Sequence, residues 1–162
     1  MAPTDESAEA LTEIERELDI AASPETVFSL LTDSREQIRW MGTEASLEPY
    51  AGGLYRVNCT GNDVALGEFV EVVPYSRVVF TFGWEGPDKP VPPGSSTVEI
   101  TLTPTDAGTH LHFLHRGLPT PAAEQFGQGW DHFLERLQIV GDGGEPGRDP
   151  WATTPAETAA DG

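Results

Sequence analysis

Polar residues that could take part in chemistry are few in this sequence, and the most informative of them is His115. His115 follows Leu111 and Phe113 at intervals of two residues, along a stretch typical of a β-strand. Its side chain should therefore share their inward face. An imidazole at such a place can donate or accept a hydrogen bond and can titrate near neutral pH. We expect either a structural histidine tied to a backbone carbonyl or an indole, or a polar contact that orients a ligand. His115 is the best candidate for a catalytic residue, although the sequence gives it no partner for general-base catalysis.

Arg16 is the second polar residue that falls in phase with apolar neighbours on a predicted strand. An inward arginine must be paired if it is buried. Glu44, Glu68 and Glu71 are the candidate partners, and the sequence does not choose among them. We expect a structural ion pair at the edge of the sheet, with a carboxylate-bearing ligand as the alternative.

Metal binding and nucleophilic catalysis find little support. His110 and His112 lie two residues apart and should share the outward face of a strand, but no third ligand and no His-Glu-x-x-His motif accompanies them. We therefore predict no metal site and no cofactor. Cys59 is the only cysteine, has no nearby histidine in the sequence, and is expected to be a small buried apolar residue. His132 is expected to be solvated, opposite the apolar stripe of its helix.

The elements that must position these residues follow from the hydrophobic periodicity. Residues 14–21 read as a half-buried strand, and SPETVFSLLTD then reads as a helix with Ser23 as its cap and Pro24 in its first position. A short second helix or turn is expected around 34–40. Six further strands are predicted near 43–48, 53–60, 63–73, 76–85, 95–103 and 108–116. The stretch 86–94 holds four prolines and two glycines, so it is predicted to be a stiff surface loop.

A long C-terminal helix is predicted from apolar residues that recur at spacings of four and three, from Phe126 to Val140. Its first turn is unusual because it holds Gly127 and Gly129, and glycine weakens helices. One interpretation is that strand backbone approaches closely there, which glycine permits. The other is that the helix begins only at Trp130 and that the glycines form an entry loop.

Composition and charge limit the classes of partner. The net charge of −18, with one lysine and eight arginines, argues against nucleic acid and anionic membrane surfaces as partners. No signal peptide or membrane-length apolar run is visible, so we predict no membrane insertion and a cytoplasmic location. Residues 1–12 and the acidic, Gly/Pro-rich residues 141–162 are predicted to be disordered tails around a domain of residues 13–140. Trp151 is then either an incidental aromatic or a short docking segment.

Six stretches in this order resemble a known family. They are IERELDIAASPETVFSLLTD, RWMG, EPYAGGLYRV, GEFVEVVPYSRVVFTFGW, GTHLHFLHRGL and GWDHFLERL, and they cover about residues 13–140. The chain resembles the SRPBCC or START-like (helix-grip) superfamily, and within it the bacterial proteins similar to the activator of the heat-shock protein 90 ATPase. The resemblance implies an α+β helix-grip fold: a curved seven-stranded antiparallel sheet wrapped around a long C-terminal helix, with two short helices after the first strand.

The resemblance also implies an apolar cavity between sheet and helix, in which family members bind or process small hydrophobic molecules. Strand and helix alternation then gives the expected cavity walls, each residue of which would serve equally well in an ordinary core. The predicted set is Trp40, Tyr55, Val57, Phe80, Phe82, Trp84, Ile100, Leu102, Leu111, Phe113, His115, Phe126, Trp130 and Phe133.

Three functions remain open at this point. The first is binding of a small hydrophobic molecule, motivated by an aromatic inner face with few ionisable groups. The second is a chaperone contact or another protein interaction, and the third is a cyclase, hydrolase or dehydratase that works with His115, Tyr55 and Arg16. Edge strands of the predicted sheet could also pair across a homodimer.

Overall fold

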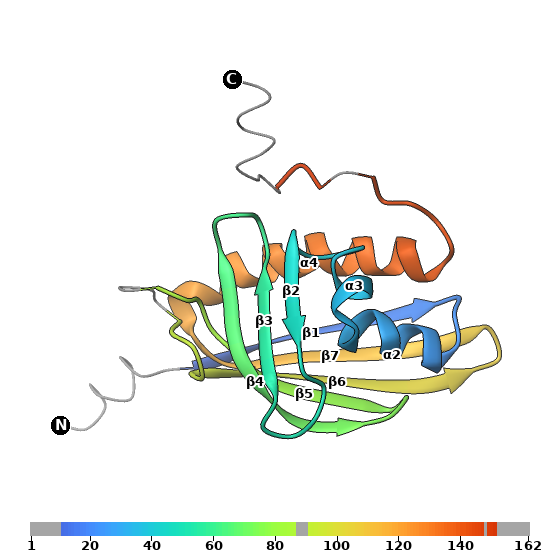
Figure 1. Cartoon of the computed structure of the whole chain (residues 1–162), viewed down its shortest axis with the longest axis horizontal. Helices are drawn as coiled ribbons and strands as arrows, with labels where there is room; N and C mark the ends of the chain where they lie inside the picture. The colour runs from blue at the N-terminus through green and yellow to red at the C-terminus, as the bar shows by residue number, and fades with distance from the viewer. Residues whose placement is uncertain (1–10, 87–90, 148, 152–162) are drawn as a thin grey trace.

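A computed structural model describes residues 11–86, 91–147 and 149–151 of the chain. Seven strands form one antiparallel sheet in the order β1-β7-β6-β5-β4-β3-β2, with two short helices after β1 and a long helix at the end. The elements are β1 (Leu11–Ile20), α2 (Pro24–Thr32), α3 (Ser34–Gln37), β2 (Glu44–Leu47), β3 (Leu54–Asn58), β4 (Val64–Val73), β5 (Arg77–Phe82), β6 (Ser96–Thr105), β7 (Gly108–Pro119) and α4 (Thr120–Gly141). The sheet curves around α4, as Figure 1 shows, and this confirms the predicted helix-grip fold.

The two short helices start where local hydrogen bonds favour them. Ser23 caps α2, since its Oγ accepts a hydrogen bond from the backbone N–H of Thr26 at 3.3 Å, and Pro24 occupies the first turn. Asp33 ends α2 and caps α3 in the same way, by accepting from the N–H groups of Arg35 and Glu36. These caps define the two short helices that connect β1 at one edge of the sheet to β2 at the opposite edge.

The C-terminal helix is longer than the sequence indicated. It begins at Thr120 with Pro121 in its first turn, so the glycines lie in its interior, and the interpretation that the helix starts at Trp130 is wrong. Its apolar stripe, which includes the fully buried Leu137, packs mainly against β1 and β7. Burying one such leucine stabilises the fold by about 1.5–3 kcal/mol. The helix is therefore held on the concave side of the sheet (Figure 1).

The core is densely aromatic at the middle of the sheet. Tyr55 stacks on Phe80 with ring centroids 3.9 Å apart, and Phe69 meets both rings edge-on. All three side chains are at most 3% exposed. This cluster joins β3, β4 and β5 and belongs to the packed interior.

The periphery shows where the predictions differ. Strand β1 begins at Leu11, two residues before the predicted domain start, because Leu11 and Thr12 pair with Pro119 and Leu118. The predicted loop 86–94 lies partly outside the described residues, but the backbone N–H of Trp84 bonds the carbonyl of Val91 at 2.6 Å, and Val91 is buried. The sheet ends in β1 and β2, so pairing of these edges in a homodimer stays a prediction.

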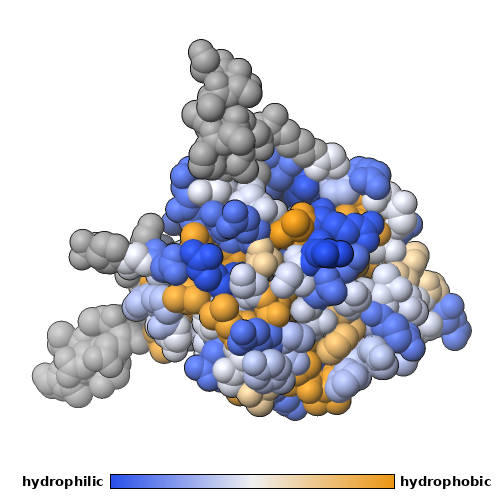
Figure 2. All heavy atoms as spheres, in the orientation of Figure 1, coloured by the Kyte–Doolittle hydropathy of each residue, from blue (hydrophilic) through white to orange (hydrophobic). Residues whose placement is uncertain are grey.

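The outer surface is mixed in character. Figure 2 shows apolar patches between hydrophilic residues on the visible face. No helix among the described residues has the length and apolar character needed to cross a membrane.

Candidate functional site

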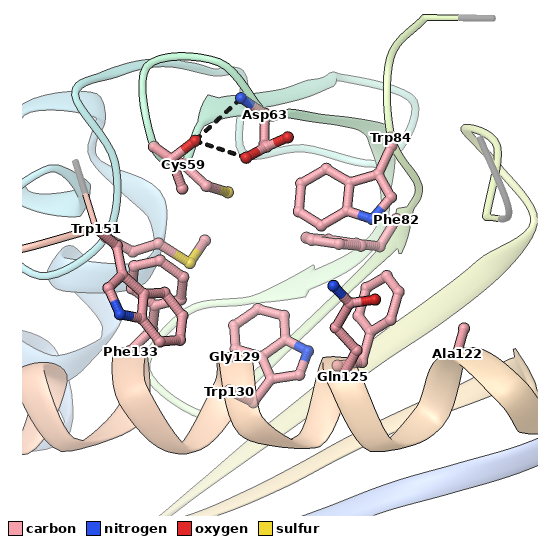
Figure 3. Close-up of a pocket in the computed structure, with 13 residues that line it drawn as sticks. Cys59, Asp63, Phe82, Trp84, Ala122, Gln125, Gly129, Trp130, Phe133 and Trp151 are labelled. Atoms are coloured by element: carbon pink, nitrogen blue, oxygen red, sulfur yellow. Dashed lines mark hydrogen bonds between the residues drawn. The ribbon is translucent and has the colours of Figure 1, made fainter. Parts of the chain in front are cut away.

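An aromatic pocket lies between α4 and the sheet. It has a volume of about 390 Å³ and is partly open to solvent. Figure 3 shows α4 as its floor, with the turn between β3 and β4 on the opposite side and aromatic rings at both ends. The lining residues are Met41, Cys59, Thr60, Asp63, Phe82, Trp84, Ala122, Gln125, Phe126, Gly129, Trp130, Phe133 and Trp151.

Aromatic side chains dominate the lining. Trp84 and Phe126 stack at 5.7 Å between ring centroids, and Phe82 lies edge-on to both at 5.6 and 6.0 Å. Trp130 lies tilted against Phe82 at 5.5 Å. These rings pack against one another and form one wall of the pocket. Because the wall is aromatic, the pocket has the apolar character of a small-molecule site.

The polar groups of the pocket lie at the β3–β4 turn and on α4. Among the described lining residues, Asp63 carries the one carboxylate, and the Thr60 hydroxyl donates to its Oδ2 at 2.7 Å. Gln125 adds an exposed amide from the helix. Cys59 is 2% exposed, and burial raises the pKa of its thiol to about 12. The thiol therefore remains protonated at neutral pH and is a poor nucleophile.

His115 lies behind the pocket wall rather than in it. Trp130 Nε1–H donates to His115 Nδ1 at 3.0 Å, which leaves the proton of the neutral ring on Nε2. That Nε2 is 2.8 Å from Ser96 Oγ, and the Ser96 hydroxyl donates to the carbonyl of Phe82 at 2.6 Å. The network joins α4, β7, β6 and β5, and each of its polar groups has a partner.

This environment makes His115 a poor acid or base. Its side chain is fully buried, and desolvation lowers its pKa to about 3. Both ring nitrogens are occupied, so no lone pair is left for a substrate. The geometry favours the structural alternative, a histidine tied to an indole. Tyr55, the other polar candidate for chemistry, is also buried, and desolvation raises the pKa of its hydroxyl well above the ordinary value.

The predicted cavity walls divide into two groups. Five residues, Phe82, Trp84, Phe126, Trp130 and Phe133, line the pocket. The other nine face inward but lie in the packed core away from it: Trp40, Tyr55, Val57, Phe80, Ile100, Leu102, Leu111, Phe113 and His115. Their inward direction follows from strand alternation, whereas the pocket itself opens between α4, the end of β5 and the β3–β4 turn.

Arg16 has a partner that the sequence did not suggest. Its Nε donates to Asp131 Oδ1 on α4 at 2.6 Å, in place of any of the three predicted glutamates. The two side chains are 36% and 61% exposed, so the pair contributes at most about 1 kcal/mol. Arg16 does face the helix as expected, but it does not line the aromatic pocket.

His110 and His112 lie on the outer face of β7 as predicted, opposite acids of β1. His110 contacts Asp19 at 2.9 Å and Glu17 at 2.8 Å, and His112 contacts Glu15 at 2.5 Å. Register places Asp19 opposite His110 and Glu17 opposite His112, with Glu15 two residues before Glu17 on β1, which the sequence alone did not show. Potential ligand atoms of Glu15, Glu17 and His112 lie within 4.8 Å of one another. These groups are already engaged, since His112 bonds Glu15 and His110 bonds Glu17.

The chain after α4 packs back onto the helix, in contrast to the disordered tail predicted from residue 141. Asp149 is 7% exposed and accepts from His132 Nε2 at 2.7 Å. Trp151 stacks on the His132 ring at 3.7 Å between centroids and borders the pocket. Arg136 donates to the carbonyl of Gly147 at 2.9 Å. The expectation that His132 is solvated is therefore wrong, because this segment covers it; residues 152–162 lie outside the described part.

Gly127 and Gly129 of α4 play different roles from the one proposed. A Cβ on Gly127 would meet only the flexible end of Arg16 at 3.3 Å, and a Cβ on Gly129 would meet no atom within 4 Å. Strand backbone approaches neither residue closely, so that prediction is wrong. Gly129 lines the pocket, where the missing side chain leaves open space.

Several lining residues escaped the sequence-based prediction. Thr60 and Asp63 come from a turn, where no periodicity marks a direction, and Trp151 comes from a segment whose composition suggested disorder. Ala122 and Gln125 lie in the first turns of α4, and the Thr120-Pro121 pair was the available signal, since proline favours the first turn of a helix.

The chain is similar to known proteins in both sequence and structure. The family model described as "Activator of Hsp90 ATPase homolog 1-like protein" matches residues 21–141. The human protein "Activator of 90 kDa heat shock protein ATPase homolog 1" is 29% identical over 112 residues, which cover 68% of this chain and 31% of the human protein. The chain thus spans about a third of the length of that relative.

Two solved structures extend the similarity. An AHSA1-like protein from Rhizobium etli is 46% identical, with a TM-score of 0.70 over 88% of this chain and 89% of that one. DynU16, a protein in the dynemicin biosynthetic locus, is 27% identical, with a TM-score of 0.73 over 86% of this chain and 50% of that one. Because the family model covers most of its length, this chain belongs to the family of Activator of Hsp90 ATPase homolog 1-like proteins.

Proposed function

We propose that this protein binds a small apolar molecule in the pocket between α4 and the sheet. The observation that carries the proposal is a partly open space of about 390 Å³ lined by six aromatic side chains from three parts of the chain. Ligand pockets in proteins start at about 300 Å³ and combine apolar walls with a few polar groups. Asp63, Thr60 and Gln125 supply those polar groups here.

Binding is favoured over catalysis by the state of the ionisable groups around the pocket. His115 is buried in a complete hydrogen-bond network, and Cys59 is a buried thiol with a raised pKa. Neither group is poised to move a proton or attack a substrate at neutral pH. Among the described lining residues, Asp63 is the remaining side chain that carries charge, and it has no basic partner in the lining.

One relative fits this proposal. DynU16 belongs to a biosynthetic locus, which is consistent with a role that involves a small molecule. The name of the human relative instead refers to the ATPase of a heat-shock protein, but the match covers 31% of that protein. A chaperone contact therefore remains the alternative, and a pull-down with purified Hsp90 that recovers this chain at stoichiometric amounts would favour it.

The binding proposal is tested by titration with N-phenyl-1-naphthylamine, a neutral apolar dye that fluoresces when it leaves water. We expect saturable binding by the natural chain and at least tenfold weaker binding by Gly129→Leu, because a side chain at 129 enters open pocket space. Gln128→Leu is the matched control, since residue 128 is exposed and does not line this pocket. Circular dichroism should confirm that both variants fold.

Two results would overturn the proposal. One is the absence of saturable binding by the natural chain. The other is equal binding by the Gly129→Leu and Gln128→Leu variants, which would place the dye outside the pocket that Gly129 lines.

A further inference from the structure

We infer that the pocket selects an aromatic ligand with a cationic amino group over neutral and anionic ligands of the same size. This inference rests on the proposed binding function and goes further by naming the charge of the ligand. It is carried by three features of the pocket: the absence of basic side chains in the described lining, the aromatic faces, and the position of one carboxylate.

The first feature is the charge of the lining. No lysine, arginine or histidine is among the described residues that line the pocket. The arginines on and beside α4 are engaged elsewhere, since Arg16 pairs with Asp131 and Arg136 donates to the carbonyls of Trp40 and Gly147. A carboxylate, sulfonate or phosphate in the pocket would therefore lose its water without gaining a counter-charge, which is costly. The net charge of −18 adds a long-range field that attracts cations and repels anions.

The second feature is the set of indole rings. Trp84, Trp130 and Trp151 border the pocket from three sides, as Figure 3 shows. The Nε1–H of Trp130 is committed to His115, so this indole offers the pocket its ring and no donor. The face of an indole attracts organic cations, by about 0.5–1 kcal/mol at exposed sites and more when the cation is desolvated. The same rings stack on the flat apolar part of the ligand.

The third feature is the place of Asp63. It lies on the β3–β4 turn, across the pocket from α4, and the Thr60 hydroxyl at 2.7 Å from Oδ2 steadies its carboxylate. Asp63 is exposed, so it stands at the rim rather than in the apolar interior. A ligand whose ring lies between Trp84 and Trp130 would thus place a terminal ammonium group near this carboxylate and near water. An anionic ligand would find no basic side chain among the described residues of this rim.

The test uses three probes that share a naphthalene ring: 1-naphthylmethylamine, 1-naphthalenemethanol and 1-naphthoate, which are cationic, neutral and anionic at pH 7. Each is measured by displacement of N-phenyl-1-naphthylamine and by isothermal titration calorimetry at low salt. We expect the amine to bind about tenfold more tightly than the alcohol. The naphthoate should bind more weakly than the alcohol.

Asp63→Asn separates the rim carboxylate from the overall charge. This variant should reduce the preference for the amine over the alcohol about two- to fivefold. Asp106→Asn is the matched control, because it removes the same charge from an exposed turn residue outside the pocket lining. The control should keep the preference of the natural chain.

The outcomes distinguish the two proposals. If the neutral dye and all three naphthalene probes fail to bind, the proposed function itself is wrong. If the dye binds but the naphthoate binds as tightly as the amine, or Asp63→Asn leaves the preference unchanged, the pocket stands and the inference about ligand charge is overturned.

Discussion

The buried imidazole of His115 makes the stability of this protein depend on pH in a way that one substitution can isolate. Burial lowers its pKa from 6.5 to about 3, so the folded chain keeps the ring neutral while the unfolded chain takes up a proton below pH 6.5. The stability contributed by the neutral ring is fully present above pH 6.5 and is lost progressively as the pH falls toward 3. His115→Gln removes this titration and keeps one donor and one acceptor at the site.

The expected size of the effect follows from the two pKa values. At pH 5 the pH lies about 1.5 below the unfolded value, and each pH unit is worth about 1.4 kcal/mol, so the natural chain has lost about 2 kcal/mol. At neutral pH, His115→Gln should be less stable than the natural chain by about 1–3 kcal/mol. The reason is that the glutamine amide reproduces the geometry of the His115 hydrogen bonds to Trp130 and Ser96 only in part. This deficit should shrink by about 2 kcal/mol between pH 7 and pH 5.

The assay is urea unfolding of both proteins at pH 7, 6 and 5, followed by far-ultraviolet circular dichroism. His110→Gln is the control with the opposite sign. The hydrogen bond from His110 to Asp19, with a smaller contribution from Glu17, raises the His110 pKa, so its stabilisation is present below pH 6.5 and is lost as the pH rises through the raised value. The His110→Gln deficit should therefore grow on acidification. A His115→Gln deficit that stays constant from pH 7 to 5 would refute the reasoning.

Three more predictions concern the pocket and its rim. Gly129→Ala should stabilise the fold by about 0.5–1 kcal/mol and raise the Tm by about 2–4 °C in a thermal scan, because the new methyl group meets no atom and alanine favours a helix interior. A lower Tm would show that the space beside residue 129 is not open. Cys59 should react with Ellman's reagent at least a hundredfold more slowly in native than in urea-unfolded protein, since burial raises its pKa to about 12; equal rates would show an accessible thiol. Trp151→Ala should weaken dye binding severalfold and leave the Tm nearly unchanged, because the indole borders the pocket and is 45% exposed; unchanged affinity would exclude it from the binding surface.

The fold could be predicted from the sequence because most of its elements are locally encoded. Alternation along residues 14–20 marks β1, Ser23 and Pro24 mark the start of α2, and the 4-3 spacing after Phe126 marks α4. Each of these signals lies within a few residues of the feature that it predicts. The family resemblance then supplied the order of the strands around the helix, which local signals do not determine.

The site was less predictable because it depends on distances between elements. Strand alternation put Phe80 and Phe82 on one inward face, and both side chains are buried. Phe80 nevertheless stacks on Tyr55 within the core, whereas Phe82 borders the pocket. The period of two gives the face of a residue and carries no information on how far the helix stands from the sheet at that point. Arg16 shows the same limit, since its direction was right and its partner, on the helix, was not foreseen.

Gly129 affects the volume of the pocket directly, because the lack of a side chain at this position leaves space open. Helix α4 would be more stable with alanine at this position, and packing does not require glycine, because a Cβ there has no neighbour within 4 Å. A residue that costs helix stability and leaves space open on the pocket side is consistent with selection for the space itself. Gly127 is different, since its Cβ would press on the Arg16 side chain at 3.3 Å. If Gly129→Ala binds the neutral dye more weakly than the natural chain, and Gly129→Leu binds it more weakly still, then the volume next to residue 129 is what the glycine preserves; full binding by Gly129→Ala would refute that reading.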